Sequence, residues 1–332
     1  MEAVIWLVWI LVVLIGAKVY LMATHRKCHS RRRLDGKTIL ITGATSGIGE
    51  ATAVKLAARG ARLLLACRNV QKAEIVAKRI AASTKNTKIE VRYVDLTRLQ
   101  TVRALADRIR AEEEKLDVLI LNAGAGKVSY PKELTEDDLE YNMAVNYFSN
   151  FLLVNSLLDV LKRSEGESRV VVVSSFFHAL GTMNLENLNY EKYFYRLNAY
   201  SDAKLAEILM VKELARRLQG SRVTVNSLHP GVVRTNIFLQ LPLWYRTLIG
   251  IVWFYMKTKE EGAETVVHCA ACESVQGISG AYFVNCQERR PSKKAQDEKL
   301  ARMLWHRTLY YVNLHDNGPD EITAAAEGNK IK

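Results

Sequence analysis

Residues 37–49 read KTILITGATSGIG, and this stretch decides the fold. Its first half is a short apolar run that predicts a buried strand. The glycines Gly43, Gly47 and Gly49 follow, and a helical pattern begins among them. In a unit of this kind the first glycine permits a tight turn, the second lets the backbone approach a pyrophosphate, and the third lets the helix pack closely on the sheet. The stretch therefore predicts a strand, a glycine turn and a helix whose N-terminus binds a nucleotide phosphate.

The rest of the chain repeats this alternation of strand and helix. Strand-like runs lie at 37–42, 61–67, 89–94, 117–122, 169–174, 222–228 and 281–285. Helix-like runs lie between them, at 47–59, 70–83, 98–114, 136–163, 198–219 and 259–274. The strands lack a polar face, which is typical of a parallel sheet covered by helices on both sides. We therefore expect one α/β domain at 37–315, with a Rossmann-type doubly wound parallel sheet of about seven strands.

The end of the second predicted strand indicates which nucleotide binds. An NAD site usually has Asp or Glu here, about 20 residues after the glycines, to bind the ribose hydroxyls. This chain has Ala66-Cys67-Arg68-Asn69 instead. Arg68 can pair with a 2′-phosphate, and no carboxylate is present to repel one; the alternative is that Arg68 is a solvated surface charge. The sequence therefore predicts NADP(H) as the cofactor.

The spacing Gly-x-x-x-Gly-x-Gly resembles that of the short-chain dehydrogenase/reductase superfamily, and further landmarks follow in that family's order between residues 36 and 290. Asp95-Leu96, Asn122-Ala123-Gly124 and Pro230-Gly231 come after the third, fourth and sixth predicted strands. The resemblance implies that they lie against the adenine, the cofactor edge of the sheet and the nicotinamide. The cofactor-binding residues that it implies are Gly43, Thr45, Ser46, Gly47, Ile48, Gly49, Arg68, Asn69, Asp95, Leu96, Asn122, Ala123, Gly124, Tyr200, Lys204, Pro230, Gly231, Val233 and Thr235.

Tyr200 and Lys204 are the first catalytic candidates. They are four residues apart in a predicted helix and so share one face. An ordinary tyrosine titrates near ~10, and a nearby ammonium favours its phenolate form. Tyr200 is therefore expected to act as general acid in carbonyl reduction and as general base in alcohol oxidation. The family resemblance implies that Lys204 also binds the nicotinamide ribose.

Two further candidates complete the predicted catalytic set. Ser175 ends the fifth predicted strand, where a hydroxyl can hydrogen-bond the substrate oxygen. Ser174 is the competing candidate, and the family pattern favours the second serine. Asn146 matches the family asparagine that holds a water in a proton relay to lysine. His178 is not expected to be a catalytic base, because Tyr200 fills that role, but it could contact substrate.

Ser175 and Tyr200 are 25 residues apart, about twice the usual gap in the superfamily. In this insertion the chain resembles the retinol dehydrogenase-like branch, which has a similar one. It also resembles that branch in its Ala-Cys-Arg-Asn strand end and its His229-Pro230-Gly231 turn. This resemblance implies an NADP(H)-dependent oxidoreductase that interconverts a lipophilic, retinoid-like alcohol and its aldehyde or ketone on a membrane such as the endoplasmic reticulum, and it leaves a homo-oligomer open. The alternatives are a steroid or fatty-aldehyde/farnesal reductase on the same fold, or a non-catalytic NADPH-binding membrane scaffold.

The N-terminus predicts a membrane anchor helix over residues 1–24. Residues 3–23 form an apolar run with one charge, Lys18, and about 20 such residues span a bilayer core. A basic linker at 25–36 follows, so the positive-inside rule places the catalytic domain in the cytosol. A cleaved signal peptide would need a basic start and a shorter apolar core, and a helix lying in the interface would need a polar face.

The composition bounds the partners of the protein. Its 332 residues carry a formal net charge of +12, with 49% hydrophobic and 25% charged residues, which is ordinary globular composition. Residues 1–37 account for +5 of that charge, and the remainder has no nucleic-acid-binding motif. We therefore expect a membrane and a lipophilic small molecule as partners, no nucleic acid, and a polar tail at 316–332.

Two features leave more than one interpretation. Residues 237–256 are largely apolar and could form a lid that admits lipid, although ordinary core packing is equally compatible and Arg246 argues against a second membrane span. The five cysteines are scattered, as in a reduced compartment. Cys269-x-x-Cys272 could bind metal or form a redox pair, but it lacks a second pair, so we expect two packed helix residues and no metal site.

Overall fold

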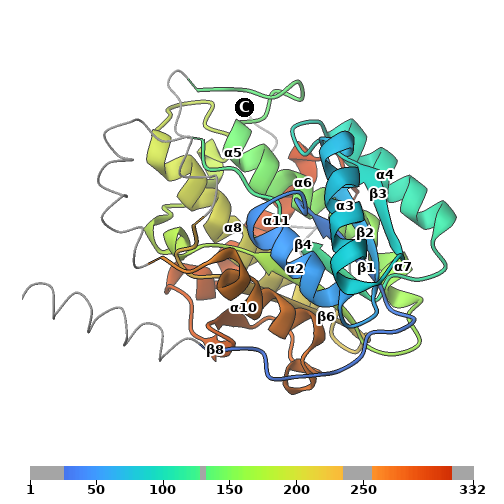
Figure 1. The fold of residues 1–332 in the computed structure, drawn as a ribbon. Coiled ribbons are helices and arrows are strands. Elements are labelled where there is room, and N and C mark those ends of the chain that lie inside the picture. The colour runs from blue at the N-terminus through green and yellow to red at the C-terminus, as the bar shows by residue number, and fades with distance from the viewer. Residues whose placement is uncertain (1–25, 128–131, 235–255, 316–332) are drawn as a thin grey trace, which may run out of the picture.

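Eight strands form one sheet in the order β3-β2-β1-β4-β5-β6-β7-β8 (Figure 1). The structure is a computed structural model that describes residues 26–127, 132–234 and 256–315. Seven strands are parallel, and β8 runs antiparallel to β7. The strands are β1 (Thr38–Thr42), β2 (Arg62–Cys67), β3 (Ile89–Tyr93), β4 (Val118–Leu121), β5 (Ser168–Val173), β6 (Val223–His229), β7 (Tyr282–Val284) and β8 (Gln287–Arg289).

The expected doubly wound α/β domain is confirmed, but the strand count of about seven was too low. The additional strand, β8, has only three residues and no buried side chain. It follows β7 through Asn285 and Cys286, which both adopt positive φ angles of 53° and 58°. Two such residues form the tight turn that matches the twist of a hairpin. The short, polar β8 gave no apolar run by which it could be found in the sequence.

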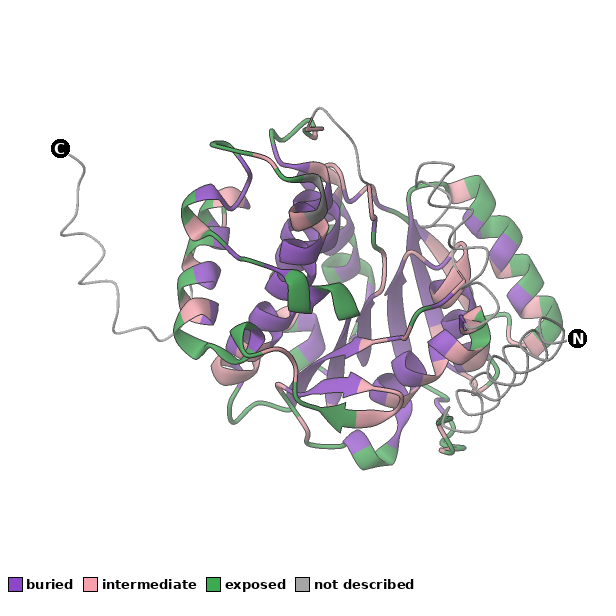
Figure 2. Cartoon of the chain, turned by 90° about the vertical axis from the view of Figure 1, so that its left-hand side faces the viewer, coloured by how far each residue is buried: buried purple, intermediate pink, exposed green. Residues whose placement is uncertain are grey.

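Helices cover both faces of the sheet, and Figure 2 shows the strands buried between them. One layer contains α2 (Gly47–Ala57), α3 (Val70–Thr84) and α10 (Lys259–Ala271), which pack with Ile39 and Ile41 of β1. The other contains α4 (Leu99–Glu112), α6 (Ser149–Ser156) and α8 (Arg196–Arg217), which pack with Leu40. Successive residues of β1 therefore point to opposite layers, and both are apolar because both faces are buried.

The prediction of one regular helix at 136–163 is wrong, because the segment is divided into shorter pieces. The segment contains α5 (Tyr141–Met143), the π-helix η1 (Ala144–Phe148), α6 and α7 (Leu158–Lys162). Within it the Asn146 amide donates to the carbonyl of Asn142 at 2.8 Å, and the Asn150 amide donates to that of Asn146 at 2.6 Å. Side chains that bond to the backbone in this way compete with the regular helical ladder. A π-helical turn inside a longer helix is frequent at functional sites.

The last described helix, α11 (Glu298–Tyr311), was not expected from the sequence. It packs on α8. Its Leu304 and Trp305 are buried in the core, and the centre of the Trp305 ring lies 4.6 Å from that of Phe151 in α6. The Asp297 side chain caps its first turn by accepting from the Leu300 amide at 2.9 Å. The remaining short helices are η2 (Phe176–Leu180), η3 (Leu185–Asn187), η5 (Glu273–Val275) and η6 (Lys294–Gln296).

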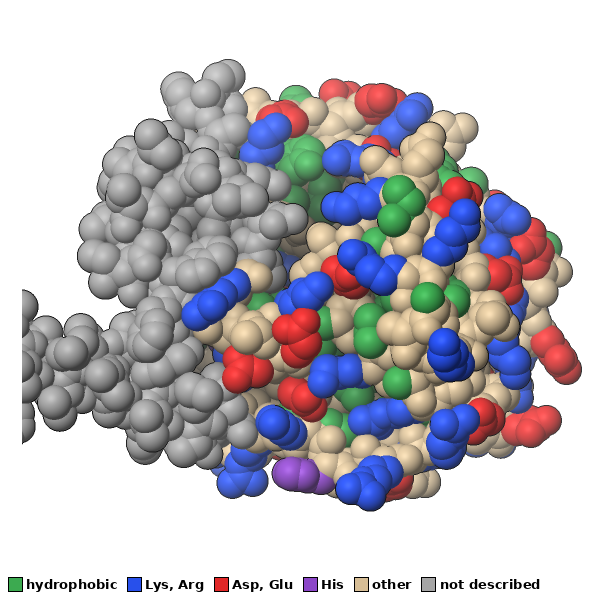
Figure 3. All heavy atoms as spheres, viewed as in Figure 1, with side chains coloured by type: hydrophobic (Ala, Val, Ile, Leu, Met, Phe, Trp, Pro, Cys, Tyr) green, Lys and Arg blue, Asp and Glu red, His purple; other side chains and the backbone are tan. Residues whose placement is uncertain are grey.

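Among the described residues, no helix is both long enough and apolar enough to cross a membrane. The predicted anchor at 1–24, Thr235, the polar tail and all of the predicted lid except Met256 lie outside those residues. Charged side chains of both signs are mixed over the face shown in Figure 3. The net positive charge of the chain is therefore not gathered into a basic stripe on that face.

Candidate active site

The glycine turn joins β1 to α2 at the carboxyl edge of the sheet. Gly43 has a φ of 71°, and a Cβ there would lie 2.7 Å from the Cα of Ala123. A Cβ on Gly49 would lie 2.3 Å from the Gly43 carbonyl oxygen and 2.4 Å from the Asn122 amide nitrogen. Asn122 in turn donates to the carbonyl of Thr42 at 3.0 Å. Only glycine fits at these two positions, because the turn, α2 and the end of β4 meet there backbone to backbone.

The start of α2 suits a nucleotide phosphate. Ser46 occupies the N-cap position but makes no side-chain capping hydrogen bond, and Gly47 follows with a φ of 58°. The first amides of a helix need an acceptor from outside the helix, and an anionic phosphate meets that need. These residues therefore fit the pyrophosphate of a dinucleotide.

The residues expected around the adenine lie at the ends of β2 and β3. The Arg68 side chain is 66% exposed, and its Nη1 lies 4.0 Å from Oδ2 of Asp95. Asn69 caps α3 by accepting from the Lys72 amide at 2.8 Å, and Leu96 is buried. Arg68 is thus held only weakly by the protein, so its guanidinium is available to an anion beside the second strand.

Tyr200 and Lys204 lie on one face of α8, as the spacing predicts. The Lys204 ammonium lies 5.8 Å from the centre of the Tyr200 ring and donates to the Val173 carbonyl at 3.1 Å. Lys204 is only 4% exposed, whereas Tyr200 is half-buried. The Phe177 ring packs edge-to-face on Tyr200 with 5.8 Å between ring centres. A buried cation beside a partly accessible phenol can favour the phenolate, which general base catalysis requires.

Asn146 and Gly124 connect the π-helix with Lys204. The Asn146 side chain is fully buried and exchanges hydrogen bonds with the backbone of Ala125, at 3.0 and 2.9 Å. A Cβ on Gly124 would lie 3.0 Å from Oδ1 of Asn146 and 3.4 Å from Nζ of Lys204. Gly124 therefore faces both predicted relay residues, and its lack of a side chain leaves open the space between them.

The two adjacent serines are in different environments. Ser174 is buried, and its hydroxyl donates to the Lys204 carbonyl at 2.7 Å. Ser175 is half-buried, and its hydroxyl oxygen accepts from the Phe177 amide at 3.3 Å. The Ser174 hydroxyl is thus committed to α8, while the Ser175 hydroxyl keeps its proton available to a substrate oxygen.

Two neutral histidines hold the segment around Ser175. His178 donates from Nδ1 to the Ser175 carbonyl at 2.7 Å and accepts at Nε2 from the Ser292 amide at 3.1 Å. His229 accepts at Nδ1 from the Phe176 amide at 3.2 Å. Burial lowers the pKa of both, to about 4 for His229, where nearby Lys257 adds to the effect. Both nitrogens of His178 are used within the protein, so this geometry favours a positioning role over substrate contact.

The Pro230–Gly231 turn follows β6 and packs against Lys257. Gly231 has a φ of 95°, and a Cβ there would lie 2.8 Å from Cδ of Lys257. Val233 is buried against Gly262 of α10, whose added Cβ would lie 2.7 Å from it. Lys257 was not anticipated, and no motif in the sequence marks it. This turn lies at the carboxyl edge, where a doubly wound sheet binds its ligand.

Glu207 is a site residue that sequence reasoning missed. It is fully buried, and its Oε1 accepts from the Lys204 ammonium at 2.9 Å. Its other oxygen, Oε2, is buried without a hydrogen-bond partner among the described residues. Burial raises the pKa of Glu207 to about 7, against the opposing effect of Lys204. The signal was an acidic residue three positions after Lys204, on the same helical face.

We expect Glu207→Gln to move the pH profile of alcohol oxidation to lower pH. Above neutral pH an ionised Glu207 cancels part of the positive field of Lys204, so its removal lets the ammonium favour the Tyr200 phenolate more strongly. The expected shift of the midpoint of kcat/KM is about one pH unit, or about 1.4 kcal/mol. Glu213→Gln is the matched control, since Glu213 is also buried on α8 but pairs with Arg216. An unchanged midpoint in Glu207→Gln would contradict this role.

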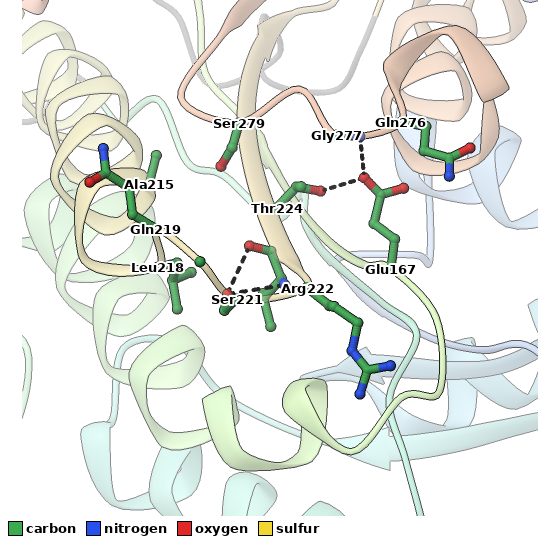
Figure 4. Close-up of a pocket in the computed structure, with 12 residues that line it drawn as sticks. Glu167, Ala215, Leu218, Gln219, Ser221, Arg222, Thr224, Gln276, Gly277 and Ser279 are labelled. Carbon is green, nitrogen blue, oxygen red and sulfur yellow. Dashed lines mark hydrogen bonds between the residues drawn. The ribbon is translucent and has the colours of Figure 1, made fainter.

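A separate pocket lies at the opposite edge of the sheet (Figure 4). Glu167 and Arg222 are among the residues that line it, and they immediately precede β5 and β6. Glu167 accepts there from the Gly277 amide at 2.7 Å and also pairs with Arg169. Because the predicted catalytic residues follow the carboxyl ends of the strands, this pocket is not part of the candidate active site.

Comparisons with known proteins agree with this arrangement. Residues 37–245 match the short chain dehydrogenase family. The chain is 45% identical over 285 residues to retinol dehydrogenase 14 of Mus musculus, covering 82% of this chain and 84% of that protein. It is 40% identical over 307 residues to retinol dehydrogenase 13 of Homo sapiens, covering 90% and 92%.

Two solved structures give the same result for the fold. An uncharacterized protein from Mycobacterium Paratuberculosis superimposes with a TM-score of 0.69 at 32% identity, covering 86% of this chain and 96% of that one. A short chain dehydrogenase from Pseudomonas syringae superimposes with a TM-score of 0.62 at 26% identity, covering 77% and 97%. The similarity thus extends through nearly the full length of the two solved structures and through most of this chain.

Proposed function

Because the chain belongs to the short chain dehydrogenase family and is a retinol dehydrogenase-like oxidoreductase, we propose that it interconverts a lipophilic alcohol and its aldehyde or ketone with NADP(H). The observation that carries this proposal is the placement of Tyr200 and Lys204 at the carboxyl edge, next to exposed apolar side chains. A nicotinamide cofactor supplies or accepts the hydride when bound.

Each polar residue has a role in this reaction. In reduction, the Tyr200 hydroxyl donates its proton to the substrate oxygen, and the Ser175 hydroxyl holds that oxygen by a hydrogen bond. Lys204 stabilises the phenolate that remains. Asn146, which lies close to Gly124 as Lys204 does, supports the relay that returns the proton. In alcohol oxidation the same groups act in the reverse direction.

The surroundings of Ser175 and Tyr200 support an apolar substrate. Phe176, Phe177 and Leu180 lie in η2, which begins directly after Ser175, and are 61%, 48% and 62% exposed. Val232, beyond the Pro230–Gly231 turn, is 51% exposed. Large apolar side chains left in solvent around a polar site are typical of surfaces that bind an apolar ligand. With the retinol dehydrogenase relatives, these side chains make a retinoid the first substrate to test.

A substrate panel tests the proposal. Purified full-length protein is incubated with NADPH and, separately, retinal, a fatty aldehyde, farnesal and a steroid ketone, and NADPH oxidation is followed. We expect turnover of retinal. Turnover of steroid or fatty aldehyde without retinal would overturn the retinoid assignment but keep the chemistry. Tight NADPH binding with no turnover of any carbonyl would overturn the enzyme itself and favour a cofactor-binding scaffold.

We also propose that Arg68 selects NADP(H) over NAD(H). Its guanidinium at the end of β2 is exposed, and within the described ranges its one carboxylate neighbour is Asp95, 4.0 Å away. Arg68→Glu is expected to weaken NADPH binding by about 10–100-fold, because charge-assisted hydrogen bonds contribute about 1.5–3 kcal/mol. NADH binding should be unchanged or tighter, because the new carboxylate can accept from the ribose hydroxyls.

Fluorescence titration with both cofactors measures this change. Lys78→Glu makes a similar charge reversal at an exposed position of α3 and serves as the control. Equal loss of NADPH affinity in the two variants would mean that Arg68 acts only through the general field of the surface. Unchanged discrimination in Arg68→Glu would place the phosphate contact elsewhere.

We further propose that residues 1–24 anchor the protein in a membrane, the endoplasmic reticulum being the first candidate, with the catalytic domain in the cytosol. The apolar run at 3–23 and the basic residues that follow it support this orientation. Deletion of residues 1–24 is expected to move the protein from the membrane pellet to the supernatant after cell fractionation. A deletion variant that still sediments with membranes after a carbonate wash would contradict the anchor.

A further inference from the structure

Three potential metal ligands from distant parts of the chain meet at the C-terminal end of α10. They are Cys28, His268 and Cys272, and one ligand atom of each lies within 4.8 Å of the other two. The two sulfur atoms are 3.4 Å apart. Cys28 belongs to the segment before β1, which runs alongside α10 in Figure 1. The Cys269-x-x-Cys272 spacing, from which no metal site was expected, contributes only Cys272 to this set, and Cys28 stands in place of Cys269.

We propose that Cys28, His268 and Cys272 bind a Zn²⁺ ion that fastens the N-terminal segment to α10. Two thiolates and one imidazole are ligands that zinc prefers, with a solvent molecule in the fourth position. Tetrahedral zinc with Zn–S bonds of ~2.3 Å places its two sulfur atoms about 3.8 Å apart. The observed separation differs from this by a few tenths of an ångström, so the side chains need only a small adjustment.

The helix and its surroundings hold the ligands in position. His268 lies in the last turn of α10, and Cys272 is the C-cap residue, whose amide donates to the His268 carbonyl at 3.0 Å. Arg169 donates to the Cys272 carbonyl at 2.7 Å. The Cys28 amide donates to Glu264 of α10 at 2.9 Å, and Glu264 also pairs with Lys55. Both sulfur-bearing residues are therefore fixed through their backbones, which keeps the two sulfur atoms close together.

Two observations favour an ion over a simple contact between thiols. Nδ1 of His268 is buried and has no hydrogen-bond partner in the part of the chain that the structure describes. Arg59 donates to the Cys28 sulfur at 3.7 Å, as donors surrounding a metal site often do to its thiolates. A disulfide between Cys28 and Cys272 would leave the His268 nitrogen without a partner, whereas zinc would use all three groups and release two thiol protons.

The site is separate from the catalytic residues. Cys272 packs in the core between the sheet and the layer of α2, α3 and α10, whereas the catalytic helix α8 lies on the opposite face. The ion would therefore stabilise the fold without touching the reaction. Because it binds the folded chain, zinc should raise the midpoint of thermal unfolding, Tm.

The experiment measures zinc directly. Full-length protein is purified under reducing conditions and dialysed against a Zn²⁺ salt, then against zinc-free buffer. Bound metal is then measured by mass spectrometry. We expect stoichiometric zinc, and Co²⁺ in its place should give the intense absorption of tetrahedral thiolate ligation. Loss of an outer-shell contact alone costs ~10–100-fold in affinity, so Cys28→Ser and Cys272→Ser should each weaken binding by more than ~100-fold. Cys286→Ser, which changes a half-buried cysteine outside the set, should bind as the wild type does.

Each other outcome overturns the proposal. Absence of retained zinc in the wild type does so without any variant, and so does equal retention in Cys28→Ser, Cys272→Ser and Cys286→Ser. A mass lower by two hydrogens, with both cysteines protected from alkylation, would show a disulfide instead. NADPH binding by each variant reports whether it is folded, independently of the metal.

Discussion

Tyr200→Phe is expected to lower kcat for carbonyl reduction by about 10²–10⁴-fold, the usual contribution of a positioned general acid. The substitution removes only the phenolic oxygen. The ring keeps its edge-to-face packing on Phe177, and Lys204 stays buried beneath it. We therefore expect NADPH affinity and thermal stability to match those of the wild type while the chemical step fails. Single-turnover kinetics with bound NADPH and retinal measure that step directly.

Tyr195→Phe is the matched control for this loss. Tyr195 precedes α8 by one residue, is 60% exposed, and packs on the Tyr193 ring at 5.6 Å. Its hydroxyl is of the same chemical kind but plays no part in the proposed reaction, so activity should be unchanged. If Tyr200→Phe retained most of its activity, the proton would have to come from another group. If both variants lost activity equally, the loss would come from a general disturbance around the site, and Tyr200 would not be identified as the proton donor.

The shared helical face of the predicted catalytic pair could be predicted from the sequence because its geometry is local. Tyr200 and Lys204 are one helical turn apart, so any regular helix places them on the same face. The glycine turn is local in the same sense, since Gly43, Gly47 and Gly49 act within one strand–turn–helix unit. The sheet followed from the repeated βα pattern, since parallel strands joined by crossover helices have few arrangements available.

The features that the sequence did not reveal depend on contacts between distant residues or on departures from regular geometry. The spacing of Glu207 and Lys204 is local, but an acidic residue at that spacing is usually exposed, and only the packing of α8 buries this pair. Asn146 was identified by its motif, but its π-helix arises from side-chain bonds that periodicity does not encode. Cys28 and Cys272 are 244 residues apart, so no spacing rule connects them. Each of these depends on tertiary packing, which hydrophobic patterns specify only in outline.

The glycine turn leads to the second large expected effect, because Gly49→Ala should impair cofactor binding and stability together. An alanine Cβ would lie 2.3 Å from the Gly43 carbonyl oxygen and 2.4 Å from the Asn122 amide nitrogen. Neither atom can move freely. The Asn122 side-chain amide donates to the Thr42 carbonyl at 3.0 Å, and the Gly43 backbone amide donates to the Ala66 carbonyl at 3.0 Å. Relief of the clash must therefore move the N-terminus of α2 away from the turn.

That displacement sets the size of the effect. Overpacking of this kind costs about 1–3 kcal/mol, and 1 kcal/mol corresponds to a fall in Tm of roughly 2–4 °C for a domain of this size. Misplacing a binding group by ~1 Å can cost ~10²-fold, so NADPH affinity should fall by about that factor. The control is Gly166→Ala, since a Cβ on Gly166 would meet nothing within 4 Å and should leave both quantities unchanged. Wild-type NADPH affinity in Gly49→Ala would mean that the close contact between α2 and the turn does not position the phosphate, and the dinucleotide would then have to bind away from the helix N-terminus.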